Sequence, residues 1–449
     1  MRTCTIIFLI LIITGLYSQE IKTDSLHTGN FKLAAIETAG INLVVWSVDH
    51  YIAKAEWANI SLESVKNNLK NGFVFDDSEF LMNQFLHPYH GNMYFNSARC
   101  NGLSFWQSVP FAFAGSLTWE LFMEIESPSN NDLFTTTLGG IMLGEVTYRV
   151  SSLILDDSAF GAERTWRELG AGLIDPIRGL NRLFQGRTRE IHKTHRQERQ
   201  AVIGDISFGG NTVGEGLDLN NGKESPILKL QFVYGTPFLK DKRKPFDYFN
   251  LHLGLNLKGI DTITSFYGEA LLFGKNLNFQ GNPDGMVQDN LFGMFQHFDY
   301  IANDVYKVAA SALGGGVISR FSAYDGMNLY TSGHLSVIVL GGSNSAYAEQ
   351  AERDYNLGPG VSGKFEGWLV NEKYGEMLVS YLRYWIYTLS GAEGQERIEI
   401  TSVKVETPIS KNFKLGGEYL YYYRQGVYVD YKDITAENNE FRTFISYRF

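Results

Sequence analysis

The sequence predicts an α+β protein in which an N-terminal helical domain precedes a transmembrane antiparallel β-barrel of roughly twelve strands. Three observations lead to this fold class: a secretory start, helical spacing of apolar residues up to about residue 186, and single alternation after about residue 201. The changes in pattern divide the chain into a signal peptide over 1–18, a helical domain over 19–186, a basic linker over 187–200 and a barrel over 201–449.

The composition fits a barrel better than a bundle of membrane helices. The chain has 449 residues with 39 basic and 49 acidic side chains, and the net charge of -10 argues against nucleic acid as a partner. Aromatic residues make up 14% of the chain, and barrels gather such residues in girdles at the membrane interfaces.

The first residues have the pattern of a signal peptide. Arg2 supplies the positive start, the apolar run 6–13 is too short to span a bilayer, and cleavage is expected after Ser18. Removal of this segment leaves Cys100 as the only cysteine, which excludes an internal disulfide and metal sites built on several cysteines. The sequence therefore predicts export to the cell envelope.

Helical signals run from residue 28 to about 186. The cap 28–30 precedes a helix with apolar residues at Ala35 and Ala39, and a second helix over about 102–124 is expected to be broken or kinked near Pro110. A third helix is expected from the cap 130–132 to about residue 155. A fourth begins near residue 162 and is interrupted at 175–176. The linker that follows fits either a contact with lipid phosphates or a solvated connection.

Strict alternation marks the second half. One face of the clearest strand is apolar, with Phe249, Leu251, Leu253, Leu255 and Leu257 expected to face lipid. The last strand ends at Phe449, which resembles the signal that the barrel insertion machinery reads. We therefore expect outer-membrane lipids and this machinery as partners, a location in the outer membrane with the helical domain on the periplasmic side, and no cofactor. A water-soluble all-β domain is the alternative.

Part of the helical domain resembles a known family. The matching residues are His87-Pro88-Tyr89-His90-Gly91-Asn92, Ala98-Arg99, Asn101-Gly102, Phe105-Trp106, Trp119-Glu120, Glu124, Pro128-Ser129, Asn131-Asp132, Gly139-Gly140, Gly144-Glu145, Asp175-Pro176 and Gly179-Leu180-Asn181-Arg182. Over roughly residues 87–186 the chain is similar to a bacterial domain of unknown function found mainly in the Bacteroidota. The resemblance implies an envelope protein and no particular reaction.

Several polar side chains of the helical domain are candidates for one site. They are His87, His90, Glu120, Glu124, Asp132, Glu145 and Arg149. Glu120 and Glu124 share a helix face and need a cation nearby, whereas Glu145 and Arg149 have the spacing of a helical ion pair. Such a centre either holds a metal or moves protons, or it is a buried network that fixes helix packing. The His-Pro-Tyr-His spacing is no standard zinc motif, which favours the structural interpretation. Gly140 and Gly144 predict close approach of another helix.

The barrel contains one further candidate. His334 and Ser336 alternate with Leu335 and therefore point to the same, inward face. A His-x-Ser pair on one strand resembles the lipid A deacylase type of barrel enzyme, in which the histidine activates the serine. The acid that orients the imidazole is expected to be Glu349 or Glu366, if the fold brings either one close.

Three functions remain from the sequence. The first is a structural or transport barrel whose helical domain acts as a plug or docking module. The second is an enzyme that modifies envelope lipids, and the third is an assembly partner of other envelope proteins. The sequence favours the first, because no Gly-x-Ser-x-Gly elbow is present and polar groups of these kinds are more often structural than catalytic.

Overall fold

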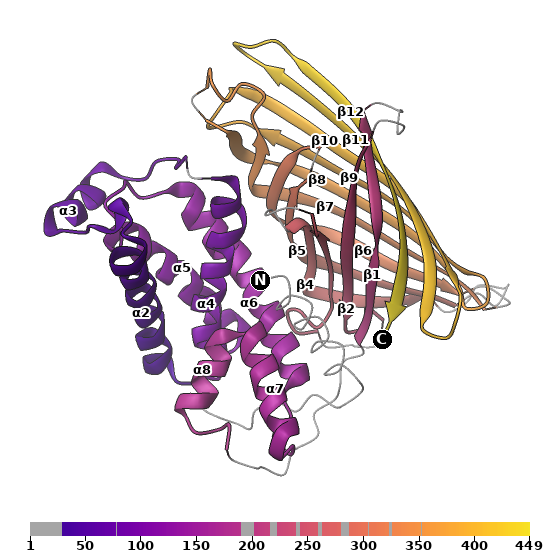
Figure 1. Ribbon diagram of the computed structural model, residues 1–449, viewed down its shortest axis with the longest axis horizontal. Helices are drawn as coiled ribbons and strands as arrows, with labels where there is room; N and C mark the ends of the chain where they lie inside the picture. Colours follow the sequence, from indigo (N-terminus) through magenta and orange to yellow (C-terminus); the bar gives the residue numbers. More distant parts are fainter. Residues whose placement is uncertain are drawn as a thin grey trace. The chain divides into compact units, whose positions relative to one another are not determined.

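The computed structural model describes residues 29–77, 79–189, 202–215, 222–238, 243–258, 263–279, 287–303, 305–322, 326–351 and 353–449. The chain divides into two compact units, 1–200 and 201–449. Figure 1 shows helices in the first unit and a closed sheet of strands in the second. The predicted signal peptide and residues 190–200 of the predicted linker lie outside the described residues.

The described part of the first unit is helical, in agreement with the prediction. Its α-helices are α2 (Phe31–Ser47), α3 (Leu62–Asn71), α4 (His87–Cys100), α5 (Phe105–Phe122), α6 (Asn130–Ile154), α7 (Gly161–Ile174) and α8 (Pro176–Phe184). Shorter helical turns are η1 (Val48–Ala53), η2 (Glu56–Ala58) and η3 (Met82–Leu86).

Side-chain caps set where several of these helices begin. Asn30 caps α2 by accepting a hydrogen bond from the Leu33 amide, and Asp175 caps α8, which begins at Pro176. For α6 the cap is Ser129, one residue before the predicted cap 130–132, because its hydroxyl accepts the Asp132 amide. A break near Pro110, one of the two outcomes expected from the sequence, is wrong, since α5 runs without interruption from Phe105 to Phe122.

The sequence patterns did not reveal α4, which packs against α6 through glycines. A Cβ on Gly140 would lie 2.6 Å from the Cα of Gly91, and one on Gly144 would lie 2.7 Å from the ring of Phe95. Only glycine allows the two helix backbones to approach this closely. The expected helix contact at Gly140 and Gly144 is thus confirmed, with α4 as the partner.

The buried stripe of α2 mixes apolar and polar residues. Ala34, Thr38 and Asn42 are buried at a spacing of four residues, whereas Ala35 and Ala39 are exposed. Thr38 shares a hydrogen bond of 2.7 Å with Ser97 of α4. Polar contacts of this kind allow a face with both apolar and polar residues to be buried. The larger apolar side chains of α2 are left at the surface.

The second unit is a closed antiparallel barrel of twelve strands, as predicted. They are β1 (Val202–Glu215), β2 (Lys223–Tyr234), β3 (Phe249–Asn256), β4 (Ile263–Phe279), β5 (Val287–Ala302), β6 (Lys307–Ser322), β7 (Met327–Asn344), β8 (Tyr355–Asn371), β9 (Gly375–Tyr387), β10 (Gly394–Pro408), β11 (Phe413–Tyr428) and β12 (Ile434–Arg448). Each strand pairs with the next along the chain, and β12 pairs with β1.

Closure removes the edges that an open sheet would expose. The register of the closing pair sets Ile206 opposite Tyr447, and the backbone of Phe449 exchanges hydrogen bonds with Gly204. The ring of Phe449 lies over this glycine, because a Cβ there would be 2.1 Å from the ring. The final residue of the sequence is therefore part of the seam.

Contacts across the barrel identify its inner face. Lys229 on β2 is bonded to Glu418 on β11, and β1 and β12 lie between these strands, so the bond crosses the lumen. Gln231 shares the face of Lys229 and is paired with His252, which therefore also faces inward. The opposite face of β3 then points outward, as the alternation predicted.

Exposure on that outer face is uneven. Phe249 is fully buried although it points away from the lumen, because its ring stacks on Tyr234 at 4.7 Å and contacts Phe246 at 6.3 Å. Leu255 is buried as well. Phe249 and Leu255 thus point outward as expected, but the expectation that they are exposed to lipid is wrong.

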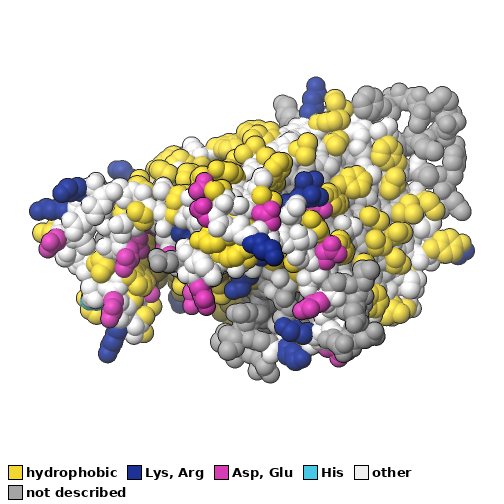
Figure 2. Space-filling model, turned by 90° about the horizontal axis from the view of Figure 1, so that it is seen from above, with side chains coloured by type: hydrophobic (Ala, Val, Ile, Leu, Met, Phe, Trp, Pro, Cys, Tyr) yellow, Lys and Arg dark blue, Asp and Glu magenta, His cyan; other side chains and the backbone are white. Residues whose placement is uncertain are grey.

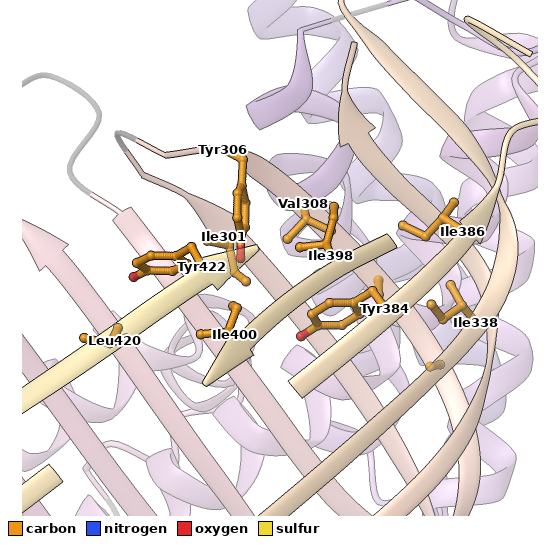
Figure 3. Packing of buried hydrophobic residues seen from close by; sticks show 12 residues of the cluster. Ile301, Tyr306, Val308, Ile338, Tyr384, Ile386, Ile398, Ile400, Leu420 and Tyr422 are labelled. Carbon is orange, nitrogen blue, oxygen red and sulfur yellow. The ribbon is translucent and has the colours of Figure 1, made fainter. Parts of the chain in front are cut away.

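The lumen contains an apolar region beside its ion pairs. Tyr384 on β9 donates to Asp299 on β5 across the barrel, so its face of the strand is the inner one. The apolar lumen cluster consists of Ile301, Tyr306, Val308, Ala310, Ala312, Ile338, Tyr384, Ile386, Ile398, Ile400, Leu420 and Tyr422. Figure 3 shows these side chains converging inside the barrel. The cluster lies toward the end at which the β5–β6 and β9–β10 turns connect the strands.

Candidate functional site

The structure separates the predicted polar residues of the helical unit into two groups. The first, here called the acidic centre, combines His87 and His90 of α4, Glu120 and Glu124 at the end of α5, and Asp132 in the first turn of α6. A second group, described below, surrounds Glu145. The sequence suggested that all seven residues form a single polar centre, and this is wrong. Glu145 lies on a different turn of α6 from Asp132 and pairs with Arg99 instead.

Helix ends position the carboxyl groups of the acidic centre. Glu120 is in the last turn of α5 and accepts a hydrogen bond of 2.7 Å from the Ser129 amide, next to the start of α6. A further hydrogen bond joins the side chains of Glu120 and Glu124. Because a carboxylate only accepts hydrogen bonds, one member of this pair must hold a proton.

The two histidines have different surroundings. His87 Nε2 lies 3.9 Å from Asp132 Oδ1, whereas His90 Nε2 lies 2.9 Å from the hydroxyl of Tyr94. The Tyr94 hydroxyl also bonds to Asn42, and Trp119 packs edge-on against His90 with ring centroids 5.0 Å apart. His90 is therefore held in an aromatic and amide environment rather than beside a carboxylate.

Burial makes the carboxyl groups of the acidic centre retain protons. Desolvation raises the pKa of Glu120 to about 8, with a further contribution from the charge of Asp132. Desolvation and the neighbouring Glu120 raise the pKa of Glu124 well above its usual value, and burial raises that of Asp132 to about 6. Burial lowers the pKa of His90 to about 3, so this imidazole is neutral at physiological pH. The centre can store or pass a proton, and carboxyl groups of this kind also bind cations.

The second group is an ion-pair network around Glu145. This fully buried carboxylate accepts from Arg99 at 2.7 and 3.1 Å and from Arg149 at 2.8 Å. Burial alone would raise the pKa of Glu145, but the two guanidinium groups reverse this and hold the pKa below its ordinary value. Arg99 and Arg178 each lie 4.2 Å from the ring of Tyr148. The predicted helical ion pair of Glu145 and Arg149 is present, with Arg99 as an additional partner.

Several members of these groups were missed by sequence reasoning. Tyr94 and Asn42 carry no motif, and Asp76, which interacts with Glu120 and Asp132, lies outside any predicted helix. Arg99 lies within the family resemblance, which is the one signal that singled it out. Long-range contacts of this kind have no counterpart in local spacing.

The barrel candidates His334 and Ser336 both face the lumen, where they are buried. The carboxylate beside His334 is Glu269, whose Oε2 lies 3.3 Å from His334 Nε2. The expectation that Glu349 or Glu366 orients this imidazole is therefore wrong. Glu349 follows the end of β7, and β4 brings Glu269 to the histidine instead.

Comparison with family models agrees with the resemblance seen in the sequence. Residues 72–177 match a family described as a domain of unknown function (DUF3943). The match begins before α4 and ends after the start of α8, so it includes both polar groups of the helical unit. A search among curated proteins found no match.

Solved structures with a similar barrel include three outer-membrane proteins. DcaP of Acinetobacter baumannii is 11% identical, with 56% of this chain and 96% of that chain covered and a TM-score of 0.26. An outer membrane channel from Pseudomonas putida F1 is 6% identical, with 56% of this chain and 97% of that chain covered and a TM-score of 0.26. The trimer form of Vibrio cholerae OmpT is 9% identical, with 56% of this chain and 100% of that chain covered and a TM-score of 0.23.

Proposed function

We propose that the chain is an outer-membrane β-barrel protein with a transport role, whose passage is closed at rest by its own side chains. The observation that carries this proposal is the inverted distribution of polarity in the barrel. Charged side chains are buried inside it, among them Asp205, Asp289, Asp299, Glu376, Glu396, Glu406, Glu418, Arg424 and Glu440.

Large apolar side chains occupy the outer face instead. Exposed examples are Phe208, Phe292, Leu335, Val337, Val361, Phe365, Trp385, Val405, Leu415, Phe441 and Ile445. Figure 2 shows apolar side chains recurring over the visible surface of the barrel. A water-soluble barrel would have the reverse arrangement, whereas a lipid-facing apolar band around a polar interior is what a membrane barrel requires.

Membrane embedding is tested at Leu335, which is 77% exposed near the middle of β7. We expect Leu335→Arg to make folding into lipid vesicles less favourable by about 2–4 kcal/mol. Leu335→Ala at the same position controls for loss of the side chain without adding charge. Equal stability of the arginine and alanine variants would contradict contact of this face with lipid.

Ion pairs that cross the lumen support a closed resting state. Lys364 on β8 binds Asp299 on β5 at 2.6 Å, and Arg448 on β12 binds Glu376 on β9 at 3.2 Å. Toward one end, the side chains of the apolar lumen cluster pack together inside the barrel. A polar solute passes only when these side chains move, so we propose that the cluster acts as the gate.

The gate is tested by conductance of the full chain in planar bilayers. We expect the parent to conduct little and the double variant Ile386→Ala/Ile398→Ala to conduct at least several-fold more, because both side chains belong to the apolar lumen cluster. Val337→Ala, on the outer face of β7, is the matched control and should behave like the parent. A correctly folded double variant with unchanged conductance would refute the transport role and leave a structural one.

A second role, membrane docking by the helical unit, rests on the exposed surface of α2 and η1. The helix Phe31–Ala53 is long and apolar enough to cross a membrane. Its exposed apolar residues are Phe31, Ile36, Leu43, Val44, Val48, Tyr51 and Ile52. We propose that this face lies on the periplasmic surface of the membrane, as interfacial helices do.

Quenching by brominated lipids tests this docking. A tryptophan introduced as Val44→Trp should add quenching relative to the parent chain, because Val44 is 65% exposed on the apolar face. A tryptophan introduced as Lys66→Trp in α3 should add none, since Lys66 is an exposed polar position. Equal quenching of the two added tryptophans would contradict the docking role.

A further inference from the structure

Two histidines meet inside the barrel without hydrogen-bond partners. His297 on β5 and His334 on β7 are 1% and 3% exposed, and none of their four ring nitrogens makes a hydrogen bond in the described part of the chain. Their ring centroids lie 5.1 Å apart. A buried ring nitrogen without a hydrogen bond destabilises the folded protein. These nitrogens are therefore candidates for binding a ligand.

A carboxylate completes the group. Glu269 Oε2 on β4 lies 3.3 Å from His334 Nε2, and ligand atoms of Glu269, His297 and His334 all lie within 4.8 Å of one another. Two ligands of one tetrahedral zinc ion, each at about 2.0–2.1 Å from the metal, are about 3.3 Å apart. The group is thus close to the spacing that a single ion would impose.

A glycine on the strand between the two histidines leaves room for the His334 ring. β6 lies between β5 and β7, and a Cβ on its Gly316 would be 2.1 Å from the Nδ1 of His334. The imidazole therefore lies over the glycine and reaches toward His297. Phe295 packs edge-on against His334 at 4.6 Å and limits where the ring can go.

We propose that Glu269, His297 and His334 bind one divalent transition-metal ion of the zinc class within the lumen. Two imidazoles and one carboxylate are the donors such ions prefer, and three protein ligands leave a position for water or another ligand. This lumen metal site goes beyond the proposed transport role and does not depend on it.

The charges around the lumen metal site are compatible with a cation. Lys364 is the nearby positive group, but its ammonium is paired with both oxygens of Asp299 at 2.6 and 2.7 Å. Glu366 lies close enough to Glu269 to interact with its charge and adds a second carboxyl group to this region. A bound dication would offset these negative charges.

The test is metal binding by the full, tag-free chain, folded in detergent and stripped with a chelator. Zn²⁺ is supplied both during refolding and afterwards, because the site is buried. We expect one Zn²⁺ per chain. We expect affinity to fall by more than about 10–100-fold in His297→Ala, His334→Ala and Glu269→Gln, since even loss of an outer-shell partner has an effect of that size.

The matched control is His252→Ala, which removes another inward-facing histidine with an unpartnered nitrogen and lies outside the group of three. It should bind Zn²⁺ like the parent. Heat-modifiable electrophoretic mobility establishes that each variant is folded.

A second measurement does not depend on variants that fold. X-ray absorption of the parent loaded with Zn²⁺ should show two imidazoles in the coordination shell. Absence of binding by the folded parent, a shell without imidazoles, or equal weakening in His252→Ala would each overturn the lumen metal site.

Discussion

Gly91 on α4 and Gly140 on α6 bring two helix backbones into direct contact, because a Cβ on Gly140 would lie 2.5 Å from the carbonyl carbon of Gly91. Both residues lie in the segment that matches the family model. The contact fixes α4 against α6, and thereby sets the positions of His87 and His90 relative to Asp132.

Gly140→Ala should therefore destabilise the helical unit by about 1–3 kcal/mol, the usual cost of an added methyl group in a tightly packed interface. The measurement is thermal loss of the helical circular dichroism signal of the full chain. Gly40→Ala in α2 is the control, since no atom lies within 4 Å of its new Cβ and alanine favours a helix by up to about 1 kcal/mol. Equal effects at the two glycines would contradict close packing of α4 on α6.

The network around Glu145 predicts a larger effect. Arg99→Met removes two hydrogen bonds from a fully buried carboxylate and should cost about 3–5 kcal/mol in the free energy of unfolding of the helical unit. The control is Glu163→Gln, which removes the ion pair of Glu163 with Arg167. Because the Glu163 side chain is 58% exposed, this change should alter the free energy of unfolding by less than about 0.5 kcal/mol. Chemical denaturation followed by circular dichroism compares the two. A small effect of Arg99→Met would show that Arg149 alone satisfies Glu145.

The raised pKa of Glu120 predicts a pH dependence. A carboxyl whose pKa is about 8 in the folded chain and 4.5 ordinarily binds its proton more tightly when folded. Its stabilising contribution is complete below about pH 4.5 and is lost as the pH rises toward 8. The free energy of unfolding of the helical unit should accordingly fall over this window.

Glu120→Gln should make this fall smaller, because the amide does not titrate and its oxygen can still accept from Ser129. Above pH 6.5 the comparison is cleanest, since the lowered pKa of His90 acts in the opposite direction at lower pH. Unfolding midpoints of parent and variant at pH 6.5, 7.3 and 8 provide the measurement. Parallel curves would mean that Glu120 is not the titrating group.

The acidic centre is either a buried network or a functional site, and paired variants separate the two. Glu124→Gln and His90→Ala are examined for folding and for metal content in the same preparations. We expect impaired folding of His90→Ala by about 1–3 kcal/mol, because Tyr94 loses a partner, and no metal in the parent at this centre. Normal folding of both variants together with loss of a bound ion would instead establish a functional site. The lumen metal site is removed beforehand by His297→Ala, so that its ion does not confuse the count.

Local pattern was sufficient for much of this fold. Alternation in 249–257 identified a strand and its two faces, and the cap at Asn30 and the stop at Asp175 set helix boundaries, because these features depend on near neighbours in the chain. Helix α4 escaped detection because its buried face is mixed, with the polar residues Asn92, Asn96 and Ser97 interrupting the apolar pattern that would mark a helix.

The sequence by itself determined the two kinds of secondary structure, the order of the units and the inward direction of His334 and Ser336. Only the tertiary structure decided that β12 closes on β1, that Glu145 binds Arg99 apart from Glu120, and that Glu269 meets His334. The physical reason is distance along the chain. Periodicity is set by residues two to four apart, whereas a barrel brings together side chains whose proximity depends on strand order and register across the whole sheet.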